Sequence, residues 1–125
     1  MLELALRSTG GPVQIGDIAR NQKIPIRFLE QLLLILKRNG LVVSVRGKQG
    51  GYNLVKHPGD IKLLEIIEAL EGEIVLATAK MKKSQPLFEV FQKVEEGLKQ
   101  ELKEISIEDL VFKKKQKERT YIYNI

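Results

Sequence analysis

A predicted helix followed at once by a predicted β-hairpin with a basic tip is the feature that most limits what this chain can fold into. The hairpin is expected over residues 41–55 (LVVSVRGKQGGYNLV), where two short β-branched runs flank a loop that ends in Gly50-Gly51. The helix is expected over residues 26–38 (IRFLEQLLLILKR), because its apolar residues recur at helical spacing. This order of elements is typical of a winged helix-turn-helix, a module that binds duplex DNA.

The rest of the first 72 residues predicts the other helices of such a module. They are expected where apolar residues recur at helical spacing, over residues 1–8, 15–22 and 61–71. Breaks separate them at residues 10–12, 21–25 and 57–60, and Asp60 is a candidate N-cap. The predicted fold class is therefore mainly α with a small β-hairpin (α+β), with a winged domain over residues 1–72.

A long helix is predicted after residues 73–83, which have no clean periodicity and are expected to form a linker. Ser84 is a candidate cap and Pro86 lies in the first turn. Apolar residues then recur every three or four positions, at Leu87, Phe91, Val94, Leu98, Leu102 and Ile105. This seam is longer than one small winged domain needs, so we expect it to pack on a second copy of the chain. The alternative is that the helix folds back on its own domain.

The C-terminal end predicts less. Residues 106–109 (SIED) resemble a capping box that opens a short helix through Val111, so that the dimerisation helix and this short helix occupy residues 84–112. Residues 113–125 form a tail that is basic and then β-prone. We expect a solvated tail, with contact to DNA phosphates as the alternative.

The positive charge lies in one half of the chain. Residues 1–60 contain nine lysines or arginines and four acids, whereas residues 61–125 contain twelve of each, so the net charge of +5 belongs to the first half. A basic half beside a neutral half is expected of a polyanion-binding module that carries an oligomerisation segment.

The predicted helix over residues 26–38 has a mixed polar face opposite its leucines. Phe28, Leu29, Leu32, Leu33 and Leu36 are expected on the apolar side. The polar arc holds Arg27, Glu30, Gln31 and Arg38. Such side chains can read base edges, because arginine donates to guanine, glutamine pairs with adenine and glutamate accepts from the cytosine amino group. Leu34 lies within this arc and Ile35 at its margin; they pack on a neighbouring element, contact a thymine methyl, or belong to a more buried helix.

The hairpin tip offers a second set of candidate contacts to DNA. Arg46 and Lys48 are placed where phosphates or a narrow minor groove attract cations. Gly47, Gly50 and Gly51 allow the backbone to bend and to approach closely, a role that serves turn geometry as well.

Several classes of function have no support in the residues. The chain has no cysteine, which excludes disulfides, thiolate zinc sites and cysteine-ligated iron-sulfur clusters. Its one histidine, His57, precedes Pro58 in a predicted turn and is expected to be solvated. There is no phosphate-cradling loop or paired carboxylate, so we expect no enzyme, catalytic residue, metal or cofactor. Apolar stretches are too short to span a membrane, and a cytoplasmic protein is expected.

Three motifs in one order give the sequence a family resemblance: LEQLL within IPIRFLEQLL, VRG..GGY within NGLVVSVRGKQGGYNL, and EALEG within IKLLEIIEALEG. From about Leu2 to Val111 the chain resembles the Rrf-two family of bacterial winged-helix transcription regulators, the IscR, NsrR and CymR type. The resemblance implies a homodimer whose long helices cross. It implies that Arg27, Glu30 and Gln31 read bases in the major groove and that Arg46, with Lys48 beside it, enters the minor groove. Gly47, Gly50 and Gly51 would shape the tip.

The chain departs from the family pattern in three ways. Many members sense iron-sulfur clusters, nitric oxide or redox state through cysteines between EALEG and the long helix, where this chain has EIVLATAKMKKSQP. The family usually starts about a dozen residues earlier with a basic segment, so a trimmed protein or a start upstream of Met1 is expected. Lys62 stands where the family generally has a serine or threonine cap.

The sequence therefore predicts a cytoplasmic, homodimeric regulator, of the repressor type, that binds a palindromic operator in double-stranded DNA without an iron-sulfur cluster. An effector, whether protein or small molecule, is left open. The alternative is a winged module that binds a protein and no longer reads DNA sequence, an interpretation favoured by Leu34 and Ile35.

Overall fold

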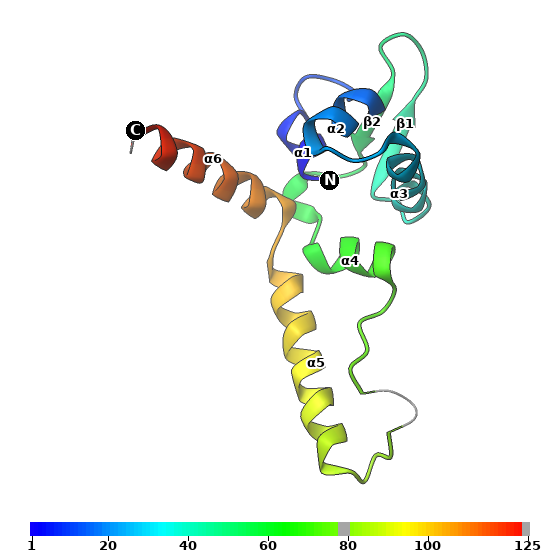
Figure 1. Cartoon of the computed structure of the whole chain (residues 1–125), viewed down its shortest axis with the longest axis vertical. Coiled ribbons are helices and arrows are strands. Elements are labelled where there is room, and N and C mark those ends of the chain that lie inside the picture. The colour runs from blue at the N-terminus through cyan, green and yellow to red at the C-terminus, as the bar shows by residue number, and fades with distance from the viewer. Residues whose placement is uncertain (78–80, 124–125) are drawn as a thin grey trace.

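The computed structural model describes residues 1–77 and 81–123, the last three of them by their backbone alone. The elements follow in the order α1 (Leu2–Leu6), α2 (Ile15–Gln22), α3 (Ile26–Arg38), β1 (Val42–Val45), β2 (Gly51–Leu54), the 3-10 helix η1 (Pro58–Asp60), α4 (Leu63–Glu71), α5 (Pro86–Glu104) and α6 (Ile107–Tyr123). Figure 1 shows α1 to α4 and the hairpin gathered in one body, from which α5 and α6 extend in different directions. The predicted fold class, mainly α with one small hairpin, is confirmed.

The core lies under α3, whose buried leucines recur on one side of the helix. Leu29, Leu33 and Leu36 pack with buried apolar residues from the rest of the winged body and from the start of α6: Leu4, Ala5, Val13, Ile18, Leu41, Val42, Ile61, Ile66 and Ile107. This apolar stripe supplies most of the stabilisation that isolated short helices lack.

The start of α6 belongs to this core. Ile107 is 2% exposed, and its amide donates to the carbonyl of Ile61 at 3.0 Å. The amide of Leu63 donates to the carbonyl of Ile105 at 2.8 Å. The corner between α5 and α6 is therefore fastened to the start of α4.

The hairpin is antiparallel and is held by a further short bridge. Its register pairs Val42 with Leu54 and Val45 with Gly51. Val13, in the connection between α1 and α2, exchanges both backbone hydrogen bonds with Tyr52, at 3.0 and 2.8 Å. The wing is thus attached to the body along its second strand.

Two predicted caps are wrong. Asp60 lies in η1, and α4 begins at Leu63, where the carboxylate of Glu65 accepts from the amide of Lys62 at 2.9 Å. Gln85, not Ser84, is the N-cap of α5, and Pro86 is its first residue as expected from the fixed φ of proline. A helix begins at the first backbone carbonyl that accepts a helical hydrogen bond, and the spacing of apolar residues does not identify that carbonyl.

The predicted short terminal helix is also wrong in length, because α6 continues to Tyr123 and the basic segment is helical. The capping box is confirmed: Ser106 and Asp109 exchange hydrogen bonds of 2.8 and 3.1 Å. Beyond it, lysine, glutamine, glutamate and arginine are good helix formers, and Lys114 pairs with Glu118 at 3.6 Å. These local preferences carry the helix through Tyr123, and the last two residues of the predicted tail lie outside the described residues.

Candidate nucleic-acid interface

The polar residues predicted on α3 share one exposed face. Arg27, Glu30, Gln31 and Arg38 are all exposed, on the side of the helix opposite Leu29, Leu33 and Leu36. At about 100° per residue, Arg27, Gln31 and Arg38 fall within a narrow arc and form a ridge along the helix, with Glu30 at its edge. The structure therefore brings these four residues to one surface that a partner can reach.

Within the described residues, the cations of this surface have no carboxylate partners. In the basic half, Arg7, Arg20 and Lys56 pair with Glu3, Asp17 and Glu65. Across residues 1–77 and 81–120, neither the arginines of α3 nor Arg46 and Lys48 of the wing make a salt bridge. A polyanion would meet these cations without competition from carboxylates.

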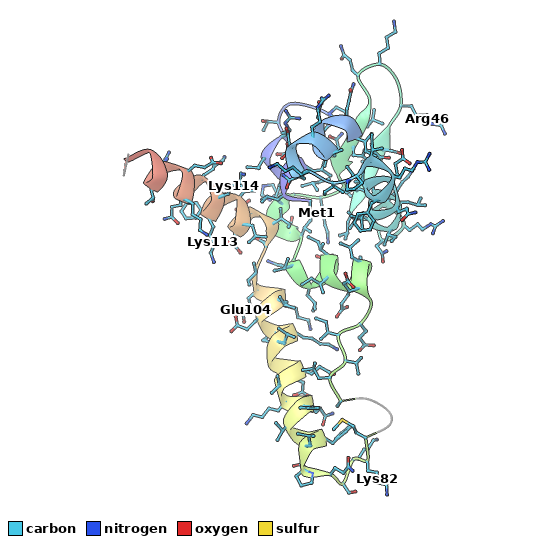
Figure 2. The ribbon with its side chains drawn as sticks, in the orientation of Figure 1. Met1, Arg46, Lys82, Glu104, Lys113 and Lys114 are labelled. Carbon is cyan, nitrogen blue, oxygen red and sulfur yellow. The ribbon has the colours of Figure 1, made fainter. Side chains whose placement is uncertain are left out.

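The wing is positioned by side chains of both neighbouring helices. The side-chain nitrogen Nε2 of Gln14, the N-cap of α2, donates to the backbone carbonyl of Lys48 at 3.2 Å. Lys37 Nζ of α3 donates to Ser44 Oγ at 2.8 Å. Figure 2 shows Arg46 projecting from the wing on the side where α3 lies. The sequence analysis missed the contribution of Gln14 and Lys37 to the position of the wing. Each acts through a hydrogen bond to a wing residue that the fold brings close, and no spacing in the sequence indicates such a contact.

The two glycines at the base of the wing are required by close approach. A Cβ on Gly50 would lie 2.2 Å from the carbonyl oxygen of Val45, and one on Gly51 would lie 2.4 Å from that of Val13. Gly51 also has φ of +150°. The backbone of the wing therefore needs glycine at both positions.

The apolar residues of α3 do not all lie where the sequence indicated. Phe28 was expected on the core side, but it is 54% exposed, because it lies at the edge of the buried stripe rather than on it. Leu34 is 47% exposed on the polar face, and Ile35 is half-buried.

The apolar seam of α5 is exposed along much of its length. Leu87, Val94 and Leu98 are exposed, whereas Phe91, Leu102 and Ile105 are half-buried. Val90, which the predicted seam left out, is 55% exposed and lies on the same side of the helix. Its spacing of four residues from Val94 was the signal that could have included it. Figure 1 shows α5 running away from the winged body, which agrees with the exposure of this side.

A comparison with protein families decides the classification. A family model described as Rrf2, iron-dependent transcriptional regulator, matches residues 1–113. The chain belongs to the Rrf2 family. Its members are DNA-binding transcription regulators of winged-helix fold, so the family expectation from the three motifs is confirmed.

Individual Rrf2 relatives agree in sequence and in fold. The chain is 47% identical over 74 residues to the HTH-type transcriptional regulator IscR of Cronobacter sakazakii, a match that covers 59% of this chain and 46% of that relative. It thus spans less than half the length of this relative. The structure of CymR, the global cysteine regulator of B. subtilis, superposes with a TM-score of 0.77 at 31% identity, over 88% of this chain and 85% of that one. The structure of IscR from T. potens superposes with a TM-score of 0.78 at 36% identity, over 90% of this chain and 77% of that one.

The residues of this Rrf2 chain do not fit an iron centre of the thiolate type. The sequence has no cysteine. His57 Nδ1 accepts from the amide of Gly59 at 3.0 Å, which occupies that nitrogen. Within the described part of the chain, no group of three or more histidine, cysteine, aspartate or glutamate side chains is placed to hold a metal ion.

Among the described residues, no helix is long and apolar enough to cross a membrane.

Proposed function

We propose that this protein is a homodimeric, sequence-specific transcription regulator that represses by binding a roughly palindromic operator, acts in the cytoplasm and needs no iron-sulfur cluster. The observation that supports it best is the exposed ridge of α3, Arg27, Gln31 and Arg38 with Glu30 at its edge, beside a wing whose cations have no carboxylate partners within the described residues.

The chemistry of the ridge favours reading of bases over simple attraction to phosphate. Arginine presents two donors to the O6 and N7 atoms of guanine, and glutamine matches the N6 and N7 atoms of adenine. Glu30 would be repelled by phosphates, so its place among cations is useful only where it accepts a hydrogen bond from the cytosine amino group. Each such contact contributes about 1 to 3 kcal/mol of discrimination.

The exposed side of α5 supports the dimer. Leu87, Val90, Val94 and Leu98 form an apolar stripe that a second copy of the same helix can cover. A two-fold axis through this contact would place two reading helices about one or more helical turns of DNA apart, which makes the operator palindromic.

Substitution of Glu30 and Arg46 separates base reading from general affinity. We expect Glu30→Ala to relax base preference more than it weakens total binding, because one discriminating contact is lost and one repulsion is relieved. Arg46→Ala should both weaken binding and relax preference in the wing-proximal base pairs. Selection of bound sequences from random DNA, followed by titration of the enriched operator, measures both effects.

Matched controls come from α5. Glu96→Ala removes an exposed acid and Lys93→Ala removes an exposed cation, and neither residue belongs to the proposed DNA interface on α3 and the wing. Both variants should leave the selected DNA motif unchanged. If the parent and the Glu30 and Arg46 variants bound operator and random DNA alike, the assignment of base reading would be wrong.

A protein-binding module is the second candidate, favoured by the exposure of Phe28 and Leu34 on α3. Salt dependence distinguishes the two, since contacts to several phosphates make affinity fall steeply with salt. Absent binding at low salt, or binding that salt does not change, would support the protein partner.

A further inference from the structure

Leu34 is an apolar side chain on the polar ridge of α3. It is 47% exposed, whereas the neighbouring Leu33 is 3% exposed and lies in the core. Around the helix axis Leu34 lies about 20° from Arg27, on the side toward Glu30, and along the axis it lies between Arg27 and Arg38. An exposed leucine in this place either leaves apolar surface in water or contacts a partner.

The surroundings of Leu34 favour a particular partner. Arg27 and Arg38 flank it, and within the described residues neither has a carboxylate partner. An apolar point among free cations complements a surface that is polyanionic and offers isolated apolar groups. The major groove of DNA is such a surface, because its apolar feature is the 5-methyl group of thymine.

We propose that Leu34 reads the 5-methyl group of a thymine in each half-site and so determines specificity at a base pair that the polar ridge residues do not read. This inference rests on the proposed function. It adds apolar recognition to an interface otherwise made of charges and amides.

The dimensions of α3 agree with this role. Leu34 follows Gln31 by about 4.5 Å along the axis, and stacked base pairs are about 3.4 Å apart, so the thymine should lie one or two base pairs from the base that Gln31 contacts. A helix with its side chains is about 10 to 12 Å across, which fits a major groove about 12 Å wide.

Removal of single methyl groups tests the contact. In the operator selected by the parent protein, each thymine is replaced in turn by deoxyuridine, and affinity is measured for the parent and for Leu34→Ala. We expect the parent to lose about fourfold in affinity at one position of each half-site. Leu34→Ala should bind the thymine operator several-fold more weakly and should no longer distinguish thymine from deoxyuridine at that position. Leu34→Met, which keeps an apolar side chain, should retain the distinction.

The control variant is Leu76→Ala, since Leu76 is a leucine of similar exposure, 37%, that lies outside α3 and the wing. It should keep the methyl preference of the parent. A Leu34→Ala variant with full affinity, or with an undiminished thymine preference, would overturn the inference while the proposed function stands. A parent protein that selects no sequence from random DNA would overturn both.

Discussion

Glu3 is a buried carboxylate that joins α1 to α2, the first helix of the helix-turn-helix. The side-chain amides of Asn21 and Gln22 donate to its two oxygens at 2.8 and 3.1 Å, and Arg7 lies 3.7 Å away. These donors, Asn21 foremost, hold the pKa of Glu3 below its usual range although burial opposes them. Glu3 therefore stabilises the fold in its charged form.

The lowered pKa of Glu3 fixes the sign of a pH effect. A depressed pKa in the folded state gives stability that is complete above the unfolded pKa of about 4.3 and is lost as the pH falls through the folded value. We expect Glu3→Gln to lower the free energy of unfolding by about 1 to 3 kcal/mol at pH 7. The difference in free energy of unfolding between the parent and Glu3→Gln should become smaller below about pH 4.3.

Urea unfolding of the parent and Glu3→Gln at several pH values measures this difference, with Glu96→Gln, an exposed glutamate of α5, as the control. Parallel stability curves for the parent and Glu3→Gln down to pH 3 would contradict the role given to the carboxylate.

Gly51 is the residue at which a single methyl group should do the most harm to the wing. The Cβ of Gly51→Ala would lie 2.4 Å from the backbone oxygen of Val13, so the paired hydrogen bonds between Val13 and Tyr52 must open. We expect a loss of about 2 kcal/mol or more in stability and a wing displaced from its position. Calorimetry and operator binding measure the two effects.

Gly16→Ala is the matched control, because the position is helical and no described atom outside its chain neighbours and its own helix backbone lies within 4 Å of the added Cβ. It should be neutral or slightly stabilising. Equal stability of the Gly51 and Gly16 variants would show that the close approach at Gly51 is not rigid.

At the level of elements, the sequence predicted those helices and strands whose positions follow from the spacing of their apolar residues. The buried stripe of α3 follows from apolar spacing, the hairpin follows from two β-branched runs that flank a loop, and both were confirmed. Phe28 was misplaced because spacing cannot say where the edge of the core lies. The length of α6 was missed because its second half has no apolar stripe, and only local helix preference and ion pairing indicate it. The side chains that hold the wing could not be predicted, since they are far apart in sequence.

The exposed stripe of α5 makes a specific prediction about association. We expect Val94→Glu to convert a dimer into a monomer, because it places a charge in the middle of an apolar contact. Gln92→Glu adds the same charge to the opposite side of α5 and should leave the dimer intact. Native mass spectrometry across a range of concentrations measures both variants. A parent that stays monomeric when concentrated would contradict the proposed dimer.

At the scale of the whole molecule, α5 is fastened to the winged body at its C-terminal end. The backbone bonds from Leu63 to Ile105 and from Ile107 to Ile61 join the corner of α5 and α6 to the start of α4. Along the helix, Lys99 contacts Glu73 at 3.2 Å, and Glu95 accepts from the amide of Leu76 at 2.7 Å. A dimer built on α5 would therefore hold its two reading helices at a fixed separation.

A fixed separation gives the last prediction, which concerns DNA with two half-sites. The second half-site is bound by an already tethered domain, so the parent should bind a two-site operator about 10²-fold or more tightly than a single half-site. Insertion of about five base pairs turns the second site to the other face of the duplex and should abolish most of this gain. Val94→Glu should bind the two-site and single-site DNA with similar affinity, since its α3 and wing are unchanged. A parent that tolerates the insertion would mean that α5 does not set the spacing, even if the protein is a dimer.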